Sequence, residues 1–148
     1  MNCSHLTALT RKQMSAPSKH LVNSGLLQGS IIDYGSGKGF DAELIGATPY
    51  DPHFSPELDT ALKVDTIYCN FVLNVIEDPD ERAFVLLRIQ HFLRDNGIAY
   101  ITVRADKKKL NGATKRGTWQ GLIELNLPVQ KRTANWVMYR LTKTQSLA

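Results

Sequence analysis

Three glycines alternate with other residues directly after an apolar pair and an acid, in the stretch IIDYGSGKGFD at residues 31–41. Glycine is favoured where the backbone has a positive φ, or where a ligand approaches the main chain with no Cβ in the way. The amide N–H groups of a helix that follows such a turn point toward an anion or carboxylate placed in it. The pattern is therefore typical of a buried strand that turns tightly into a helix beside a ligand.

Spacing separates the ligand classes that use glycine-rich loops. A phosphate-binding G-x-x-x-x-G-K-[ST] loop is excluded, because it needs glycine in place of Ile32 and Ser or Thr in place of Gly39. The dinucleotide fingerprint G-x-G-x-x-G needs glycine in place of Phe40 and remains only as a loose match. The remaining pattern, two hydrophobic residues followed by Asp-x-Gly-x-Gly-x-Gly, resembles the first motif of the Rossmann-like S-adenosylmethionine-dependent methyltransferases. An ordinary glycine-rich turn without a ligand is the other open alternative.

Composition indicates an ordinary globular protein. The 148 residues, 43% hydrophobic and 22% charged, suit one domain spanning 1–148. Cys3, Cys69 and the four histidines show no metal-ligand spacing, so we predict no metal site and a reduced, cytoplasmic protein. The N-terminus has no long apolar core, and no run approaches the ~20 residues of a membrane span, so no membrane partner is expected.

Charge is distributed unevenly along the chain. Residues 1–103 carry eight Lys or Arg against twelve Asp or Glu, whereas residues 104–148 carry ten against two. A basic block interleaved with Trp119 and Trp136 fits a nucleic-acid-binding or other phosphate-binding surface. The residues proposed for that contact are Lys107, Lys108, Lys109, Lys115 and Arg116. Solvated loops with chance enrichment are the alternative.

Alternating helices and strands predict an α/β fold. In chain order we expect a helix at 15–25, strands at 31–34 and 47–51 around a short helix at 41–45, a buried strand within 65–76, a helix from 78 to the Asn96-Gly97 stop, and a strand at 98–103. The long helix should bury a stripe that includes Leu86, Leu87 and Ile89. Strands at 121–127 and 136–142 should then pair with each other.

Two segments make the resemblance more specific. DYGSGKGFD and FVLNVIEDPDER, followed by the strand IAYITVR, resemble the class I S-adenosylmethionine-dependent methyltransferases, in particular the short bacterial and phage domains of the DNA-phosphorothioation-associated type. The likeness covers about residues 11–104. It implies a doubly wound Rossmann-like methyltransferase sheet with a C-terminal antiparallel hairpin, and S-adenosyl-L-methionine as the cofactor. Only thirteen residues separate Asp51 from Asp65, so the sheet should be abbreviated at one edge.

The resemblance also suggests which residues bind the cofactor. In nucleoside-binding doubly wound folds, an acid about 20 residues past the loop accepts the ribose hydroxyls, and Asp51 lies eighteen residues after Asp33. A turn-forming Asp before Pro52 is the alternative. The predicted cofactor-binding residues are Asp33, Gly35, Ser36, Gly37, Gly39, Asp51 and Asn70.

The chemistry is less well specified than the cofactor. Methyl transfer from a sulfonium is an in-line displacement, so a base is needed only when the acceptor must lose a proton. Asn70 is the one catalytic candidate, because it could orient an acceptor amine, although a strand-end hydrogen bond also explains it. Cys69 is expected in the core. The prediction is therefore a methyltransferase with an undetermined acceptor, nucleic acid being one candidate, and a non-catalytic cofactor-binding or partner-binding module is the alternative.

Overall fold

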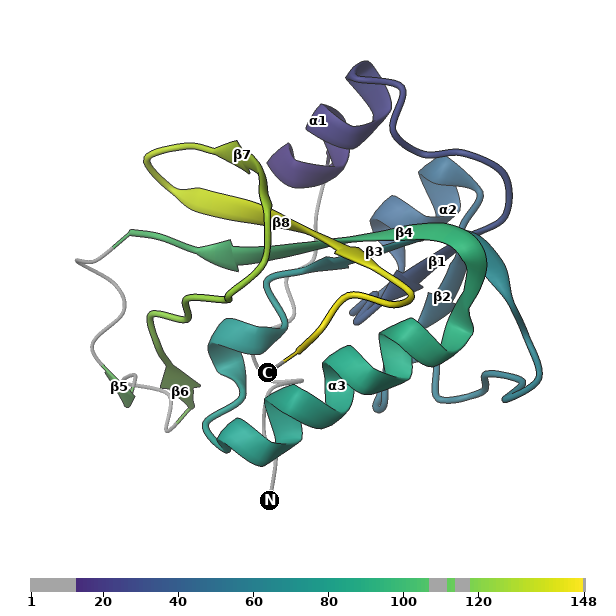
Figure 1. Ribbon diagram of the computed structural model, residues 1–148. Helices are drawn as coiled ribbons and strands as arrows, with labels where there is room; N and C mark the ends of the chain where they lie inside the picture. The colour runs from purple at the N-terminus through teal and green to yellow at the C-terminus, as the bar shows by residue number, and fades with distance from the viewer. Residues whose placement is uncertain (1–12, 107–111, 114–117, 148) are drawn as a thin grey trace.

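A six-stranded sheet with the order β2-β1-β3-β4-β8-β7 forms the centre of the computed structural model, which describes residues 13–106, 112–113 and 118–147 (Figure 1). The parallel strands are β1 (Ile31–Tyr34), β2 (Thr48–Tyr50), β3 (Val64–Asn70) and β4 (Leu93–Arg104). The antiparallel strands at the far edge are β8 (Trp136–Thr142) and β7 (Val129–Arg132). This is the predicted doubly wound sheet with an antiparallel C-terminal edge.

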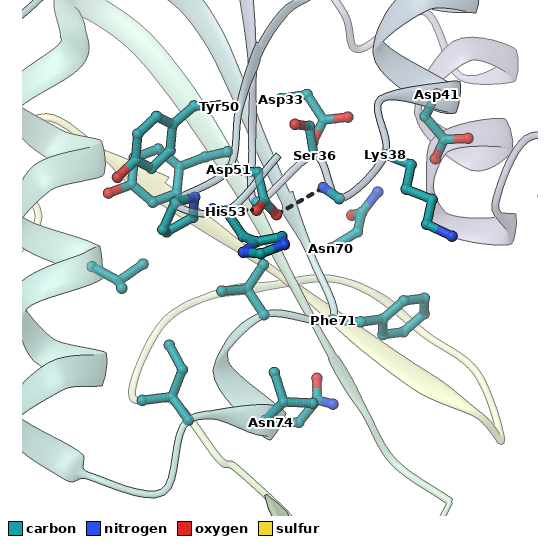
Figure 2. Close-up of a pocket in the computed structure, with 18 of the residues that line it drawn as sticks. Asp33, Ser36, Lys38, Asp41, Tyr50, Asp51, His53, Asn70, Phe71 and Asn74 are labelled. Atoms are coloured by element: carbon teal, nitrogen blue, oxygen red, sulfur yellow. Dashed lines mark hydrogen bonds between the residues drawn. The ribbon is translucent and has the colours of Figure 1, made fainter. Parts of the chain in front are cut away.

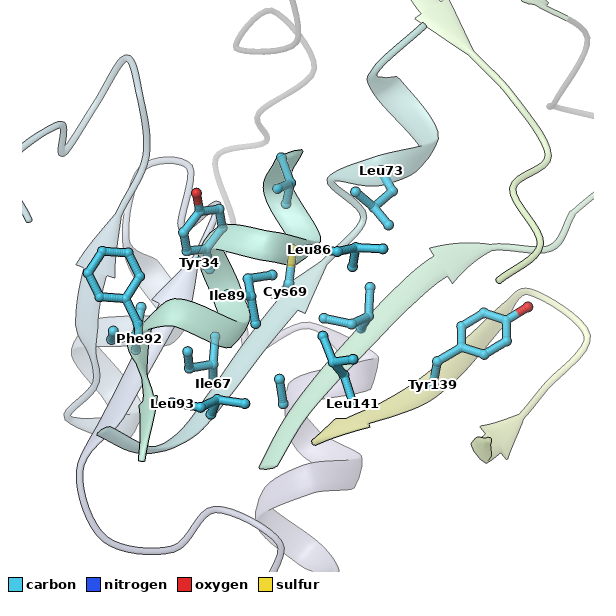
Figure 3. Packing of buried hydrophobic residues seen from close by; sticks show 14 of the residues in the cluster. Tyr34, Ile67, Cys69, Leu73, Leu86, Ile89, Phe92, Leu93, Tyr139 and Leu141 are labelled. Carbon is cyan, nitrogen blue, oxygen red and sulfur yellow. The ribbon is translucent and has the colours of Figure 1, made fainter. Parts of the chain in front are cut away.

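Helices cover both faces of the sheet (Figure 1). They are α1 (Ala16–Asn23), α2 (Phe40–Ile45) and α3 (Pro79–Phe92), with a 3-10 turn, η2 (Leu73–Val75), before α3. On one face the buried side of α3 packs against β1, β3 and β4 through Ile67, Leu86 and Ile89 (Figure 3). On the other face, Leu21 of α1 joins a second cluster with Tyr68 and other sheet residues.

Helix α1 lies where the sequence predicts it. Helix α1 follows Ser15, has Pro17 in its first turn, and is followed by Gly25 with a φ of 66°. Ser15 does not cap the helix through its side chain, however. Its hydroxyl donates instead to Asp41, at the beginning of α2. The predicted cap is therefore used for a tertiary contact between two helices.

The long helix begins as predicted and ends earlier. The Asp78 carboxylate accepts a hydrogen bond from the Asp80 amide at the N-terminus of α3. The helix ends at Phe92 rather than at Asn96-Gly97, which lies inside β4. Leu93 is buried and pairs with Val64, and a register shift then brings Ile98 opposite Thr66. Strand pairing and burial at Leu93 therefore override the local stop signal.

The predicted apolar stripe of α3 is only partly right. Ala83 and Leu87, which it also includes, are exposed, Leu87 by 57%, whereas Val85, Leu86, Ile89 and Phe92 are buried. Spacings of three and four residues relate the buried positions 85, 86, 89 and 92, which form one face of the helix, and this face is rotated away from the predicted one.

The buried strand expected within 65–76 is present as β3, which ends at Asn70 because Phe71 has a φ of 61° and η2 follows it. The strand predicted at 121–127 is wrong. Residues 121–127 form no strand, although Ile123, Leu125 and Leu127 pack against the core. Their alternation therefore reports burial on one side of an extended segment, and β7 replaces them as the partner of β8. A separate two-stranded sheet pairs β5 (Gly112–Ala113) with β6 (Trp119–Gln120).

The missing edge strand is confirmed. Strand β2 lies at the end of the sheet order, and the next strand along the chain, β3, pairs on the other side of β1. Between them the described chain makes one isolated bridge, from Asp51 to Ser55.

The proposed nucleic-acid contacts Lys107, Lys108, Lys109, Lys115 and Arg116 lie outside the described residues. Within the described part, no helix has both the length and the apolar character that a membrane crossing requires.

Candidate functional site

A cavity of about 600 Å³ lies at the carboxyl ends of β1 to β4. Its volume is within the range of small-molecule sites, about 300–1,000 Å³. Strand β1 pairs with β2 on one side and with β3 on the other, so the cavity lies where the strand order reverses. Ligands of open α/β sheets bind at such switch points. All seven residues predicted to bind a cofactor line this cavity: Asp33, Gly35, Ser36, Gly37, Gly39, Asp51 and Asn70. Figure 2 shows Asp33, Ser36, Asp51 and Asn70 among them.

The glycine loop has the backbone that its sequence predicts. Gly35, Gly37 and Gly39 have φ values of 88°, 56° and 85°. The amides of Gly35 and Ser36 both donate to the carbonyl of Tyr50, at 2.7 and 2.8 Å, and so join the loop to the end of β2. A Cβ on Gly35 would lie 2.2 Å from Val72 Cγ2. Gly35 is therefore required by close packing as well as by its left-handed backbone.

Asp51 connects the end of β2 to the glycine loop. Its Oδ2 accepts from the Gly37 amide at 3.0 Å, and its Oδ1 accepts from the amides of His53 and Phe54 at 2.9 and 3.1 Å. The predicted turn role is therefore present, and Asp51 lines the cavity as well. A carboxylate has about four acceptor positions, and these three bonds leave room for one more donor.

Asp33 is a buried carboxyl at the end of β1. Burial, with smaller contributions from Asp41 and Asp51, raises the pKa of Asp33 to about 7. The Tyr68 hydroxyl approaches closely enough to lower that pKa somewhat, but it falls short of hydrogen-bond geometry. Because the charged form is disfavoured mainly by loss of water, a cation bound nearby would restore ionisation of Asp33.

A buried polar network joins α1, α2 and β3 beside the glycine loop. Asp41 Oδ2 accepts from the hydroxyls of Ser15 and Ser18 at 2.6 and 2.7 Å, and its Oδ1 accepts from the Ser15 amide at 3.1 Å. Asn70 Nδ2 donates to Ser18 Oγ at 3.0 Å. Ser15 and Asp41 also line the cavity. Sequence analysis missed this network, because Ser15 looked like a helix cap and Asp41 like the first residue of a helix.

The network holds Asn70 with one side of its amide unpaired. Asn70 Oδ1 is buried and has no hydrogen-bond partner among the described residues, and the same is true of Ser36 Oγ. Both residues line the cavity. Buried polar atoms are almost always paired, so unpaired ones that face a cavity indicate a polar ligand. The strand-end bond foreseen for Asn70 is thus real and uses only its Nδ2.

A second group of residues, from more distant segments, lines the other end of the cavity. Phe71 and Asn74 follow β3, Arg104 ends β4, and Gln120 lies in β6. Asn74 is 1% exposed, and its Nδ2 donates to Gln120 Oε1 at 3.2 Å. We call Phe71, Asn74, Arg104 and Gln120 the Asn74 end, and residues 33–39 with Asp51 the glycine-loop end. No sequence motif identified the Asn74 end.

Two further expectations concern Cys69 and metals. Cys69 is fully buried in the core, as predicted, and burial raises the pKa of its thiol. It is not among the residues that line the cavity. Across residues 13–106, 112–113 and 118–147 no group of three or more His, Cys, Asp or Glu side chains is placed to hold a metal ion.

Three solved structures share the fold at low sequence identity. The 1,6-didemethyltoxoflavin-N1-methyltransferase of Burkholderia thailandensis, solved with 1,6-didemethyltoxoflavin and S-adenosylhomocysteine, matches with a TM-score of 0.67 and 18% identity over 88% of this chain and 78% of that one. The N-methyltransferase NodS of Bradyrhizobium japonicum, in complex with S-adenosylhomocysteine, matches at 0.58 and 14% over 97% and 98%. A TehB-like S-adenosylmethionine-dependent methyltransferase of Corynebacterium glutamicum matches at 0.56 and 13% over 90% of each chain.

These similarities establish the fold. The chain has the Rossmann-like fold of the class I S-adenosylmethionine-dependent methyltransferases, in the abbreviated form described above. They do not support the narrower phosphorothioation-associated type. No family model matches the sequence, and no curated protein matches it significantly.

Proposed function

We propose that this protein is an S-adenosylmethionine-dependent methyltransferase that binds its cofactor at the glycine-loop end of the cavity. The observation that carries the proposal is the convergence, at the switch point of the sheet, of all seven residues predicted from sequence. The fold is that of proteins solved with S-adenosylhomocysteine or S-adenosylmethionine. The bound cofactor would supply an electrophilic methyl group on a sulfonium.

The side chains present fit such a cofactor. Asp51 has acceptor capacity left for a ribose hydroxyl, and the unpaired Ser36 Oγ and Asn70 Oδ1 can bind polar groups of the amino-acid portion. The positive charge of the sulfonium would favour the ionised form of Asp33, whose pKa burial raises to about 7. The chain's own part in the reaction is therefore to bind and orient both partners.

Calorimetry with S-adenosylhomocysteine tests the cofactor assignment. The wild type should bind in the micromolar range, and Asp51→Ala should weaken binding roughly 10- to 150-fold, the effect of losing a hydrogen bond to a charged group, about 1.5–3 kcal/mol. Asp59→Ala is the matched control, because Asp59 is an acid of the same connection that does not line the cavity. Absence of binding, together with binding of a nicotinamide dinucleotide, would assign the protein to the oxidoreductases.

The acceptor is a separate part of the proposal. Two of the similar structures are N-methyltransferases by name, which favours a nitrogen acceptor. Nucleic acid stays a candidate because of the basic block after residue 104, from which the described residues include Lys131 and Arg132, both exposed on β7. If the block neutralises phosphates of duplex DNA, replacing Lys107, Lys108 and Lys109 with Ala should flatten the salt dependence of binding by up to about three units. Unchanged DNA binding would exclude these lysines.

A non-catalytic cofactor-binding module is the second candidate. It is favoured by the small size of the chain and by its abbreviated sheet edge. Incubation with a methyl-labelled donor and cell extract, followed by separation of nucleic acid, protein and small molecules, distinguishes the two functions. Label in one fraction identifies an enzyme and its acceptor class, whereas tight binding without transfer to any fraction identifies the module.

A further inference from the structure

We propose, resting on the function above, that Asn74 Oδ1 binds an N–H group of the methyl acceptor, so that the substrate is a neutral nitrogen compound held at the Asn74 end of the cavity. Asn74 is 1% exposed, and its Oδ1 has no hydrogen-bond partner in the described part of the chain. It lines the cavity, across from the glycine loop and Asp51 in Figure 2. Leaving such an oxygen unpaired destabilises the protein, and a donor on a ligand would recover that loss.

The rest of the Asn74 amide is held in place. Its Nδ2 donates to Gln120 Oε1 at 3.2 Å, and the Asn74 carbonyl accepts from the Gly121 amide at 2.8 Å. Asn74 therefore joins η2 to the segment around β6 by two hydrogen bonds, one from its side chain and one to its main-chain carbonyl. The bond to Gln120 assigns the nitrogen to that side of the amide, so Oδ1 is the atom of this cavity-lining residue that is left without a partner. The orientation of the acceptor atom is set by residues far apart in the sequence.

The surroundings of Asn74 suit a flat, largely apolar molecule. Phe71, Val75 and Ile76 line the cavity on the same segment of chain. Phe71 has a φ of 61°, and the Arg104 guanidinium lies 5.5 Å from the centre of its ring. A non-glycine residue in the left-handed region is strained, and such strain is concentrated at functional sites. Phe71 and Arg104 therefore form, with Asn74, a wall of the cavity that offers an aromatic ring and a cation.

The chemistry selects a neutral nitrogen. An amine or heteroaromatic nitrogen compound can donate N–H to Asn74 and still present a lone pair, whereas a protonated amine has none. A hydroxyl is a poor nucleophile until it loses its proton, so it would need a base in addition. An amide oxygen is not such a base, and a neutral nitrogen needs none.

Methyl transfer to such a nitrogen exchanges one bond of the methyl carbon for another. The nitrogen lone pair forms the new N–C bond to the methyl carbon, while the S–C bond breaks and its electron pair stays on sulfur. Positive charge passes from sulfur to nitrogen, and the nitrogen loses its proton to water afterwards. Asn74 takes up no proton and acts by orienting the N–H so that the lone pair is aligned with the methyl group.

A matched pair of small molecules tests the recognition without any turnover. Benzimidazole and benzoxazole have the same shape, and benzimidazole alone carries an N–H. Binding of each to the protein saturated with S-adenosylhomocysteine would be followed by chemical-shift titration. Benzimidazole should bind about three- to tenfold more tightly, the effect of one neutral hydrogen bond. In Asn74→Leu the ratio of the two affinities should fall to about one.

Two further variants complete the test. Gln120→Leu removes the group that orients the amide from a half-buried position, so it should reduce the ratio even if Asn74→Leu does not fold. Thr102→Val is the control, because Thr102 Oγ1 is also buried and unpaired but does not line the cavity, and the ratio should not change. Equal affinities in the wild type, or a ratio retained in both Asn74→Leu and Gln120→Leu, would overturn the proposal.

The affinity for S-adenosylhomocysteine separates this inference from the proposed function. Asn74→Leu should bind it within about twofold of the wild type, because Asn74 lies away from the glycine-loop end. A loss of more than tenfold would place Asn74 in the cofactor site and overturn the inference alone. If the wild type itself bound no S-adenosylhomocysteine, the proposed function would fail first. The benzimidazole ratio of the free protein would then still report whether Asn74 recognises an N–H.

Discussion

The two ends of the cavity use left-handed backbone in different ways. At the glycine-loop end, three glycines adopt positive φ values within five consecutive residues. At the Asn74 end, the positive φ falls on Phe71, which pays for its conformation with strain and places a ring on the cavity wall. The first end is suited to close approach of a ligand to the backbone, and the second to contact with side chains.

This difference suggests that the two ends of the cavity recognise different molecules. The backbone amides and the one carboxylate of the glycine-loop end would bind parts of the cofactor that do not vary. A local sequence motif is enough to place these amides and this carboxylate. Side chains such as Asn74 and Gln120 come from separate segments and can be changed without altering the sheet. We therefore expect substitutions at the glycine-loop end to affect stability and cofactor binding, and substitutions at the Asn74 end to affect the acceptor.

The largest effect is expected for Gly35→Ala. The new Cβ would lie 2.2 Å from Val72 Cγ2 on a backbone with a φ of 88°. Strain and overpacking together should destabilise the protein by roughly 2–6 kcal/mol in urea unfolding and abolish binding of S-adenosylhomocysteine. Gly39→Ala is the matched control, since its φ is 85° but no atom lies within 4 Å of the added Cβ. It should cost only about 1–2 kcal/mol, and an equal loss in both would show that packing against Val72 is unimportant.

Asp33 should make stability depend on pH at the glycine-loop end. Burial raises its pKa from 3.8 to about 7, so between these values the folded state holds a proton that the unfolded state has lost. Stability from this group is therefore highest below about pH 4 and falls as pH rises toward 7, by about 2–3 kcal/mol between roughly pH 5 and 7, and it levels off above that. Asp33→Asn should remove this dependence, as measured by urea unfolding at several pH values. An unchanged slope would mean that Asp33 ionises normally in the folded protein.

The smallest effect is expected for Phe71→Gly at the Asn74 end. Relief of the left-handed conformation, about 1–2 kcal/mol, should offset much of three losses: the packing of the half-buried ring against the Leu21 cluster, about 1 kcal/mol, and the contact with Arg104 and the lower flexibility of phenylalanine, each about 0.5–1 kcal/mol. The net change in the free energy of unfolding should stay within about 1 kcal/mol. Phe92→Ala in the core, by contrast, should cost about 3–5 kcal/mol. A comparable loss for Phe71→Gly would show that its ring, and not its strain, dominates its contribution.

Much of the glycine-loop end could be predicted because its determinants are local. Strand β1 has the predicted bounds, and the positive φ values of the loop follow from glycines that alternate after an apolar pair. Asp51 reached the cavity because a connection of one short helix leaves it little freedom. The abbreviated sheet edge could be predicted from one spacing, because the residues between Asp51 and Asp65 are too few for a helix and a strand.

The failures of prediction have a common physical cause. Asn96-Gly97 would end a helix in isolation, but burial of Leu93 and its pairing with Val64 give β4 an earlier start. Residues 121–127 alternate because one side of the segment packs on the core, and periodicity cannot distinguish that from a strand ladder. Both outcomes depend on partners more than 20 residues away, which a local pattern does not contain.

Local sequence patterns were enough to predict the fold class and the residues of the glycine-loop end, because alternating helices and strands and a glycine loop are properties of short, consecutive segments. The contacts of Ser15 and Ser18 with Asp41, and of Asn74 with Gln120 46 residues away, appear only in the folded chain. Those contacts arise where η2, α1 and β6 pack around the carboxyl ends of the strands. The cost of burying a polar atom then depends on neighbours that only the folded chain brings together.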